Sequence, residues 1–322
     1  MHIPLARRLA AELPRISLAL DRAQAELPAP VQPVVGHILQ AGGKRLRPFL
    51  TVLLARLLGY GDDDIYPLAA SMEMLHAATL LHDDVLDGAL TRRGRATAHT
   101  RFGVVPVILA GDALLSHANA LVAAYGDARL SLCFSQATVH TAAGEIQEIA
   151  SQGRVDQSHE NYLEIITGKT AWLIRASCEM GALRAGATDR MLELAGSYGL
   201  QLGMAFQMVD DALDFAPSEL TGKPSCGDVR EGKLTPPLRL YRNSLDAPAQ
   251  AAFDATFAAT AFDEAQACEI GACIRARGFD VACRELASRA LEQARVALHE
   301  LPDAPERELL EYMLAHVRDR EK

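Results

Sequence analysis

The sequence has few aromatic residues, and no segment alternates apolar and polar residues over the length of a strand. Aromatic residues make up 5% of the 322 residues, and there is a single tryptophan. Aromatic and β-branched side chains are enriched in strands, whereas alanine and leucine, which are abundant in this chain, favour helices. These absences argue against a β-sheet protein.

The sequence also lacks an excess of positive charge. It contains 32 lysines and arginines against 41 aspartates and glutamates, which gives a formal net charge of −9 at pH 7. Nucleic acid is therefore not expected as a partner, because its phosphates repel a net-acidic protein. Hydrophobic residues make up 49% of the chain, an ordinary share for a folded globular protein.

No cysteine pair has the C-x-x-C spacing of a zinc or redox site. We expect most cysteines to be small core residues in a reducing, cytoplasmic compartment. Charges and prolines interrupt the first twenty residues, which therefore do not resemble a secretory signal. The strongest apolar run, VVPVILA from Val104, is too short for a membrane span. We expect a soluble protein without a transmembrane segment.

Apolar residues recur at steps of three and four through most of the chain, the spacing of one helix face. The pattern predicts helices over 65–81, 104–125, 131–150, 158–183, 188–214, 234–245, 262–276, 279–300 and 304–319. Pro48 is expected to open a further helix. No linker of glycine, serine and proline interrupts the pattern. We therefore expect an all-α bundle of roughly ten or more helices, forming one domain over residues 1–322.

Two apolar segments, LLHDDVLD and MVDDALDF, each end in three aspartates with D-D-x-x-D spacing. At 3.6 residues per turn, the three carboxylates of each run share one helix face. If the two helices face each other, six carboxylates converge and require cations. Oxygen ligands suit Mg²⁺, with phosphate oxygens completing its shell. A solvated acidic helix end is the alternative for a single run. The predicted metal ligands are Asp83, Asp84, Asp87, Asp210, Asp211 and Asp214.

Basic residues stand beside glycines and beside both aspartate runs. They occur in AGGKRLRP, TRRGRAT, TGKTA and TGKPSCGDVREGK. Arginine can donate two parallel hydrogen bonds to one phosphate, and lysine offers a point charge. Any one of these residues alone is typical of a solvated surface charge. Their recurrence predicts pockets for diphosphate.

These motifs occur in the order and spacing of the trans-isoprenyl diphosphate synthases, a family that the chain resembles from Gly42 to Leu238. The resemblance implies a single-domain orthogonal helical bundle of the isoprenoid synthase type around a central cavity. It also implies a homodimer that joins isopentenyl diphosphate to an allylic diphosphate, with three Mg²⁺ ions. The first aspartate run has two residues between its outer aspartates, which is similar to the long-chain branch.

The resemblance implies roles for single residues as well. Positions that contact the allylic diphosphate are matched by Arg92, Lys169, Thr170, Gln207, Lys223 and Lys233. Positions of the isopentenyl diphosphate site are matched by Lys44, Arg47, His76 and Arg93. A histidine satisfied within the core is the alternative for His76. Cys226 replaces the usual glycine of G-K-x-x-G-x-D, and because glycine permits positive φ, we expect the turn to shift by one residue.

Small residues precede the first aspartate run, where the family carries bulky aromatics that stop the growing chain. These small residues are Ala78 and Thr79, and Met72 or Tyr125 is expected to form the floor of a tunnel. The facing segment contributes Ala118, Ala120, Ala123 and Ala124, and close packing explains such residues equally well. We expect a hexaprenyl to decaprenyl product. The alternatives are a geranylgeranyl-type synthase, a terpene cyclase and a non-catalytic helical subunit.

The C-terminal segment HVRDREK is rich in charge. It could close over the site through Arg318 or Arg320. A frayed, solvated end is the favoured interpretation.

Overall fold

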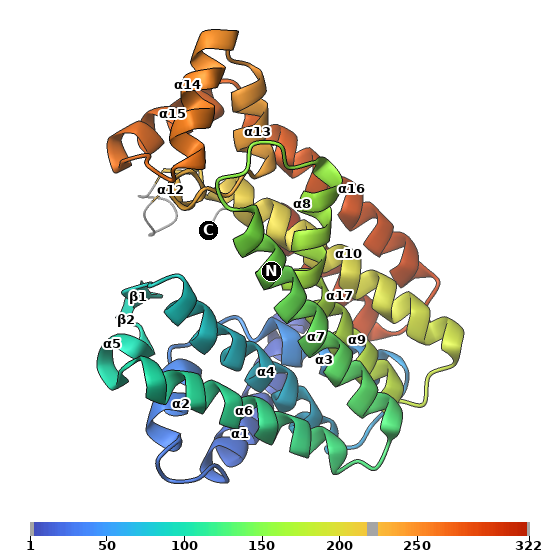
Figure 1. Cartoon of the computed structure of the whole chain (residues 1–322). Coiled ribbons are helices and arrows are strands. Elements are labelled where there is room, and N and C mark those ends of the chain that lie inside the picture. The colour runs from blue at the N-terminus through green and yellow to red at the C-terminus, as the bar shows by residue number, and fades with distance from the viewer. Residues whose placement is uncertain (1–2, 218–224, 321–322) are drawn as a thin grey trace. The chain divides into compact units, whose positions relative to one another are not determined.

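The computed structural model describes residues 3–217 and 225–320, and these residues are almost entirely helical (Figure 1). The first helices are α1 (Ile3–Ala25), α2 (Gln32–Leu39), α3 (Leu46–Leu57), α4 (Ile65–Leu86), α5 (Ala98–Phe102), α6 (Val104–Ala123) and α7 (Ala128–Ser151). They are followed by α8 (His159–Ile166), the π-helical turn η1 (Thr167–Ala171), α9 (Trp172–Arg184) and α10 (Asp189–Leu213). The last are α12 (Gly227–Glu231), α13 (Pro236–Asn243), α14 (Ala247–Ala258), α15 (Glu264–Ala276), α16 (Phe279–His299) and α17 (Pro305–Arg318). The all-α prediction is confirmed.

Each helix predicted from apolar spacing is present. The helix predicted over 65–81 continues to Leu86, and the one predicted over 158–183 is α8, η1 and α9 in succession. The prediction that Pro48 opens a helix was two residues late, since α3 begins at Leu46. Proline is tolerated throughout the first turn, where the N–H groups have no partner within the helix. Within residues 3–217 and 225–320, five helices were not predicted: α1, α2, α5, α12 and α14.

The arginine-rich stretch after α4 forms a small β-hairpin. Strands β1 (Thr91–Arg92) and β2 (Arg95–Ala96) pair antiparallel, with Thr91 opposite Ala96. The two turn residues, Arg93 and Gly94, have positive φ values of 52° and 73°. Two consecutive residues with positive φ match the right-handed twist of a tight hairpin. The hairpin fixes Arg92 and Arg93 at the end of α4.

The chain divides into two compact units. The first contains Met1–Thr138, Ala176–Gly196 and Leu301–Leu310, and the second contains Val139–Arg175, Ser197–Glu300 and Glu311–Lys322. The first aspartate run belongs to the first unit and the second run to the second unit. The single domain and the central cavity inferred from the sequence stay predictions.

The core of the first unit is built around α4, which packs against α1, α3 and α6. Leu68, Met72 and Leu75 on α4 are at most 1% exposed. Burying a side chain of this size contributes about 1.5–3 kcal/mol to folding. The helix is apolar on most faces until its last turn, so the aspartates there are held on a rigid, well-packed element.

In the second unit, the helices α12 to α15, coloured gold to orange in Figure 1, surround a separate cluster of buried apolar side chains. The rings of Phe253 and Phe257 lie 5.5 Å apart, and both side chains are buried. Phe215, directly after the second aspartate run, is fully buried in the same cluster. This packing anchors the chain on the C-terminal side of α10.

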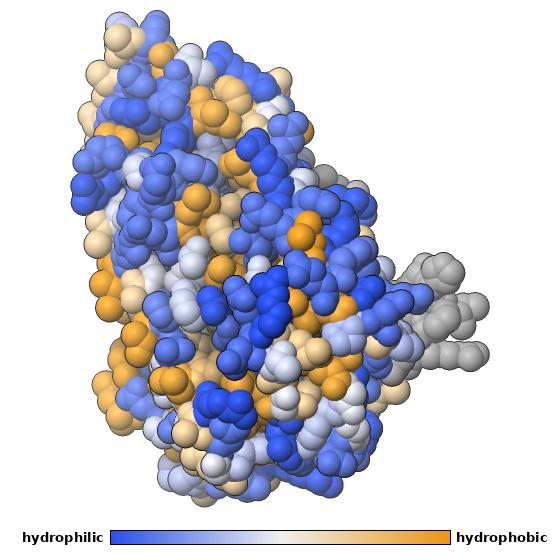
Figure 2. Space-filling view, turned by 90° about the vertical axis from the view of Figure 1, so that its right-hand side faces the viewer, coloured by the Kyte–Doolittle hydropathy of each residue, from blue (hydrophilic) through white to orange (hydrophobic). Residues whose placement is uncertain are grey.

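Apolar side chains also reach the surface. On the face shown in Figure 2, hydrophobic residues lie scattered among hydrophilic ones. Helix α6 is long and apolar enough to cross a membrane by length and composition, which is weak support for a span, and 28% of its apolar window is buried. Val105 and Leu109 on α6 are 66% and 61% exposed. The predicted absence of a transmembrane segment stays a prediction.

Gly181 allows α9 to approach α3 within the first unit. A Cβ atom at this position would collide with the carbonyl oxygen of Thr51. Gly181→Ala should therefore lower the free energy of unfolding by about 1–3 kcal/mol, because separating the two helices costs more than alanine gains in helix propensity. Denaturation in urea measures the change.

Gly61→Ala is the matched control. Gly61 has no positive φ and open space around it, so the substitution should leave the free energy of unfolding unchanged. Equal stabilities of the two variants would contradict the close contact between α3 and α9.

Candidate active site

The first aspartate run forms the last turn of α4. Asp84 is 1% exposed, and its Oδ1 accepts a hydrogen bond of 2.7 Å from Nε of Arg92 on the hairpin. Its Oδ2 is buried and has no hydrogen-bond partner among the described residues. Asp83 is half-buried and Asp87, one turn further, is exposed. Asp84 therefore ties the hairpin to α4, and Asp83 and Asp87 lie on the more accessible side.

Arginines gather around the N-terminal end of α3 in the same unit. Arg45, in the left-handed conformation, donates to Glu73 Oε1 at 2.7 Å and to the carbonyl of Leu39 at 2.5 Å. Arg93 donates to the carbonyl of Gly42. Arg45 is therefore a structural residue, because its guanidinium fastens the loop to α4.

Arg47 differs from Arg45 because its Nε is buried without a hydrogen-bond partner among the described residues. Burial lowers the pKa of Arg47 to about 10, so the side chain stays charged at neutral pH. A buried donor without a partner costs about 1–3 kcal/mol, which an anionic ligand would recover. Lys44, in the loop that precedes Arg47, is exposed.

His76 lies among these arginines. Burial, reinforced by their positive charges, holds the pKa of His76 well below its ordinary value, so the imidazole is neutral at physiological pH. The arginines are Arg47, Arg93, Arg92 and Arg45. A neutral imidazole can donate or accept a hydrogen bond without adding charge to the group. The structure thus brings His76 together with Arg47 and Arg93, which the resemblance matches to the same substrate, and also with Arg92, which it matches to the other substrate.

In the second unit, two glycines bring three helical elements into backbone contact. A Cβ on Gly144 of α7 would collide with Gly168 and Lys169 of η1, and a Cβ on Gly203 of α10 would collide with Ala171. The π-helical turn therefore lies directly against α7 and α10. Such turns are frequent at functional sites, and this one presents Lys169 and Thr170.

The contact between α7 and η1 places two glutamates beside two lysines. Lys169 Nζ lies 2.9 Å from Glu145 Oε2 and 2.6 Å from Glu148 Oε1. Lys233 Nζ lies 3.1 Å from the same Glu148 oxygen and 2.7 Å from Glu231 Oε2. We refer to these five residues, Lys169, Lys233, Glu145, Glu148 and Glu231, as the lysine–glutamate group.

The charges in this group stabilise one another. Burial alone would lower the pKa of Lys169, but Glu148 and Glu145 raise it to about 12. Burial opposes the charge on Lys233 as well, yet its carboxylate neighbours raise its pKa far above the ordinary value. Conversely, the two lysines lower the pKa of Glu148 against the effect of burial. All three side chains are therefore ionised at neutral pH.

The contact between η1 and α10 connects Thr170 to the second aspartate run. Gly203, Gln207 and Asp211 follow one another at four-residue steps and share a face of α10. Thr170 Oγ1 donates to Gln207 Oε1 at 2.8 Å, and Gln207 Nε2 donates to Asp211 Oδ1 at 2.8 Å. These bonds bring together Thr170 and Gln207, two of the residues that the resemblance matches to the allylic diphosphate.

Asp211 is buried, with 7% of its surface exposed. Its Oδ2 accepts a 2.6 Å hydrogen bond from the hydroxyl of Tyr162 on α8. Burial, together with the charges of Asp210 and Glu148, raises the pKa of Asp211 to about 7 in spite of its two hydrogen bonds. The side chain is thus held inside the second unit by protein donors.

Asp214 caps the segment that contains the unusual cysteine. Its carboxylate accepts hydrogen bonds of 3.0 Å from the backbone N–H groups of Gly227 and Asp228. The predicted one-residue shift of the turn was wrong: Cys226 itself adopts the left-handed conformation, with φ 61°. A cysteine can hold this strained conformation because its side chain is fully buried, with Sγ against Gly271. Lys223, predicted to contact diphosphate, lies outside the described residues.

The C-terminal end is not frayed at Arg320, contrary to the favoured interpretation. Arg320 Nη2 lies 3.2 Å from Asp210 Oδ1, and its guanidinium stands 4.4 Å from the ring centre of Phe206. The backbone carbonyl of Arg320 accepts a hydrogen bond from Arg284. Arg318 is exposed and pairs with Asp319. Arg320 is held in place because its guanidinium meets an aspartate and an aromatic ring.

The residues predicted to set product length lie in the first unit. Ala78 and Met72 are 2% and 0% exposed, and Thr79 donates to the carbonyl of His76. The Tyr125 hydroxyl donates to the carbonyl of Asp64. Among the alanines of the facing segment, Ala118 is buried, whereas Ala120, Ala123 and Ala124 are exposed. Only Ala118 can therefore lie against α4, and the tunnel stays a prediction.

No three acidic, histidine or cysteine side chains of the described residues converge closely enough to hold a metal ion on their own. Asp84, Asp211 and Asp214 already have the protein partners given above. Mg²⁺ characteristically uses one or two carboxylates and completes its shell with water and substrate phosphate. The aspartate runs offer only oxygen ligands, which is the ligand type that Mg²⁺ prefers.

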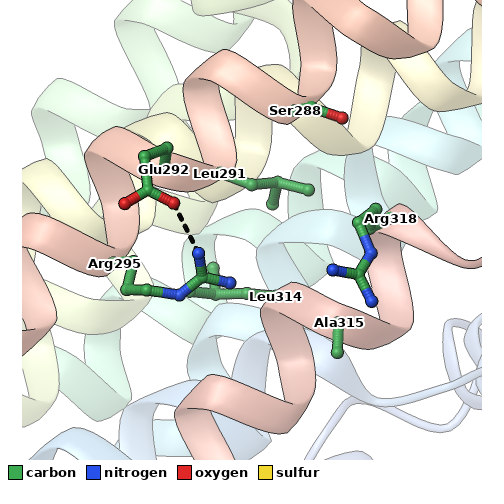
Figure 3. A pocket seen from close by; sticks show the side chains of 7 residues that line it. All are labelled: Ser288, Leu291, Glu292, Arg295, Leu314, Ala315 and Arg318. Atoms are coloured by element: carbon green, nitrogen blue, oxygen red, sulfur yellow. Dashed lines mark hydrogen bonds and ion pairs between the residues drawn. The ribbon is translucent and has the colours of Figure 1, made fainter.

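A pocket of about 150 Å³ lies elsewhere in the second unit, between α16 and α17 (Figure 3). Arg295 at its rim pairs with Glu292 at 2.5 Å and with Glu311 at 3.2 Å. Leu291 and Leu314 contribute apolar surface. No residue predicted to bind substrate or metal lines this pocket.

Sequence reasoning missed Glu145, Glu148 and Tyr162 as members of the site, and it named Arg320 only as the less favoured alternative to a frayed end. Each contacts a predicted residue from a distant part of the chain. The only available signal was the three-residue spacing of Glu145 and Glu148, which puts two carboxylates on one face of an apolar helix.

Comparison with known proteins agrees with the family resemblance inferred from the motifs. A sequence model of the polyprenyl synthetase family matches residues 28–270. Octaprenyl diphosphate synthase of Escherichia coli (strain K12) is 36% identical over 288 residues, 88% of each chain. The solved structure of a decaprenyl diphosphate synthase from Rhodobacter capsulatus has a TM-score of 0.92, with 34% identity over 100% of both chains. A polyprenyl synthase from Caulobacter crescentus CB15, complexed with calcium and isoprenyl diphosphate, has a TM-score of 0.92 at 35% identity, over 99% of this chain and 97% of that one.

These similarities extend over nearly the whole chain and include its fold. They confirm the resemblance inferred from the motifs, and they show that the protein is a prenyltransferase with the all-α isoprenoid synthase fold. The chain belongs to the polyprenyl synthetase family.

Proposed function

We propose that this enzyme condenses isopentenyl diphosphate with an allylic diphosphate, in a Mg²⁺-dependent reaction, to form a medium- to long-chain polyprenyl diphosphate. The observation that carries the proposal is that each unit pairs an aspartate run with a group of cations. Arginines accompany Asp83 to Asp87 in the first unit, and the lysine–glutamate group accompanies Asp210 to Asp214 in the second. Two cationic groups suit a reaction with two diphosphate substrates.

The aspartates differ in their proposed roles. Asp83, Asp87 and Asp210 are the proposed metal ligands, since the first two are one helical turn apart and all three reach the surface. Asp84, Asp211 and Asp214 serve mainly to hold the hairpin, α8 and α12 in place. When bound, Mg²⁺ supplies positive charge that stabilises the leaving pyrophosphate. Three ions are proposed, as the family resemblance implies.

The cations then divide between the substrates. Lys169 and Lys233 are the proposed donors to the allylic diphosphate, together with Arg92, Thr170 and Gln207. Lys44, Arg47, His76 and Arg93 are the proposed isopentenyl diphosphate site. Arg47 supports this assignment because its buried Nε needs a partner.

Charge develops on the pyrophosphate as it departs, and fixed cations stabilise it more in the transition state than in the ground state. The double bond of isopentenyl diphosphate then attacks the allylic carbon. The departed pyrophosphate removes the final proton. An apolar surrounding protects the allylic cation from water.

A cytoplasmic location is part of this proposal. None of the six cysteines forms a disulfide, which suits a reducing compartment.

The proposal predicts that the protein elongates farnesyl diphosphate with isopentenyl diphosphate in the presence of Mg²⁺. A chelator should stop the reaction. Asp83→Ala and Asp210→Ala should each lower the elongation rate at least about 100-fold, because lost charge stabilisation acts directly on the transition state. Mass spectrometry of the products measures the rate.

Asp303→Ala is the control, since Asp303 is 91% exposed and lies in neither cation group. It should retain the rate of the unmodified enzyme. Absence of elongation with every allylic primer would refute the proposed reaction, and near-normal rates in both aspartate variants would refute the metal assignment.

A hexaprenyl to decaprenyl product is proposed from the small residues before the first run. Ala78→Tyr should shorten the main product, because a phenol ring at this buried position occupies space that the growing chain needs. Ala11→Tyr, at an exposed position on α1, is the control and should not change the product. Product masses from both variants, with thermal melting to verify folding, decide the matter. An unchanged length in Ala78→Tyr contradicts the assignment.

A geranylgeranyl-type product is the second candidate. It requires the same chemistry with a shorter tunnel. The buried Met72, two helical turns before Thr79, favours it if its side chain blocks the path. The same product masses distinguish the two candidates.

We further propose a homodimer that buries an apolar stripe on α7. Leu132, Val139 and Ile146 recur at every seventh residue of this helix and are 58%, 65% and 68% exposed. A seven-residue repeat puts them on one face. Three large apolar side chains in a row exceed what a monomer's surface normally exposes.

Replacing Leu132 and Ile146 together by Asp should yield a monomer, because two carboxylates cannot be buried in an apolar interface without partners. Light scattering after size-exclusion chromatography measures the mass. Val281→Asp, at a position that is 54% exposed on α16, is the control and should stay dimeric. A double variant that keeps the mass of the unmodified protein contradicts this interface.

A further inference from the structure

The lysine–glutamate group carries more negative than positive charge. Two lysines face three glutamates, at Lys–Glu distances of 2.6–3.1 Å. A site built only to attract diphosphate would carry a net positive charge. The excess of carboxylate therefore needs an explanation.

Glu148 has the central position in this group. One of its oxygens, Oε1, lies within ion-pair distance of both Lys169 and Lys233. The side chain is 18% exposed, and the lysines are 24% and 17% exposed. At this degree of burial, charges interact several times more strongly than at the open surface.

Glu148 and a diphosphate would bind the same two ammonium groups. One carboxylate oxygen of Glu148 lies within ion-pair distance of two lysines from separate elements, η1 and the segment before α13. A phosphate oxygen could bind both lysines in the same way. The lowered pKa of Glu148 agrees with this geometry, since both lysines favour its charged form. Its carboxylate would thus remain charged beside a bound diphosphate.

We propose that Glu148 is a positioning residue that keeps Lys169 and Lys233 together and also limits their affinity for diphosphate. The inference rests on the proposed role of these lysines in diphosphate binding. In the empty site, Glu148 prevents the two ammonium groups from repelling each other. In the occupied site, its charge repels the pyrophosphate product and promotes its release.

Glu148→Gln tests the proposal, because it keeps the size and the acceptor oxygen of the side chain but removes its charge. Inorganic pyrophosphate, without allylic primer or isopentenyl diphosphate, is the probe. Calorimetry should show that the variant binds pyrophosphate about tenfold more tightly, the effect of one removed like charge at short range. In turnover, pyrophosphate should inhibit the variant at correspondingly lower concentrations.

Glu160→Gln is the matched control. Glu160 lies on α8, is exposed, and is not part of the lysine–glutamate group. Its substitution should leave pyrophosphate affinity unchanged. A purely structural role for Glu148 would lower the melting temperature of Glu148→Gln without strengthening binding.

Equal or weaker pyrophosphate binding by folded Glu148→Gln overturns the proposal. Should that variant not fold, Glu231→Gln replaces it, since Glu231 contacts only Lys233 within the group and is 53% exposed. This variant should bind pyrophosphate a fewfold more tightly, and unchanged affinity would likewise overturn the proposal. Failure of elongation in the unmodified enzyme, by contrast, refutes the proposed function and leaves the pyrophosphate measurement intact as a separate result.

Discussion

The site depends on one constraint: a charge taken out of water must meet an opposite charge or a hydrogen-bond donor. Asp84 meets Arg92, Glu148 meets Lys169 and Lys233, and Asp210 meets Arg320. In each pair, one partner belongs to a motif inferred from the sequence to bind metal or diphosphate. The charges proposed to bind ligand are therefore held in place by other charges of the protein. Ligand binding at the proposed site would exchange or share these internal partners, so they would influence affinity as well as stability.

Helix packing brings these partners together. Gly144 and Gly203 let η1 approach α7 and α10 at backbone contact, which places Lys169 beside Glu148 and Thr170 beside Gln207. A larger residue at either glycine would separate the elements and break both sets of contacts. The π-helical turn then presents two consecutive polar side chains to different neighbours. The close backbone contacts at Gly144 and Gly203 therefore determine which partners Lys169 and Thr170 meet.

Much of the fold followed from the sequence, because apolar residues spaced at three and four residues specify a helix wherever one face is buried. That signal correctly predicted α4, α6, α7, α10 and α16. It was silent on α14, where alanines surround only two buried phenylalanines, and on the hairpin, which is too short for any alternation. The motifs likewise named the residues that we propose to bind ligand, but not their partners within the protein. Glu148 could not be found this way, nor could the pairing of Arg320 with Asp210, since an ion pair across the fold leaves no local pattern.

The conformation of Cys226 shows a further limit. Sequence reasoning assumed that a residue with a Cβ would avoid positive φ, yet burial against Gly271 and the cap by Asp214 hold Cys226 there.

We expect the internal ion pairs to occupy the places that substrate charges take in the working enzyme. A crystal structure with Mg²⁺ and an unreactive allylic diphosphate analogue tests it most directly. We expect Lys169 and Lys233 to donate to diphosphate oxygens, and Asp83 and Asp87 to ligate metal. Lysines bound only to glutamate, with the diphosphate elsewhere, would contradict the claim.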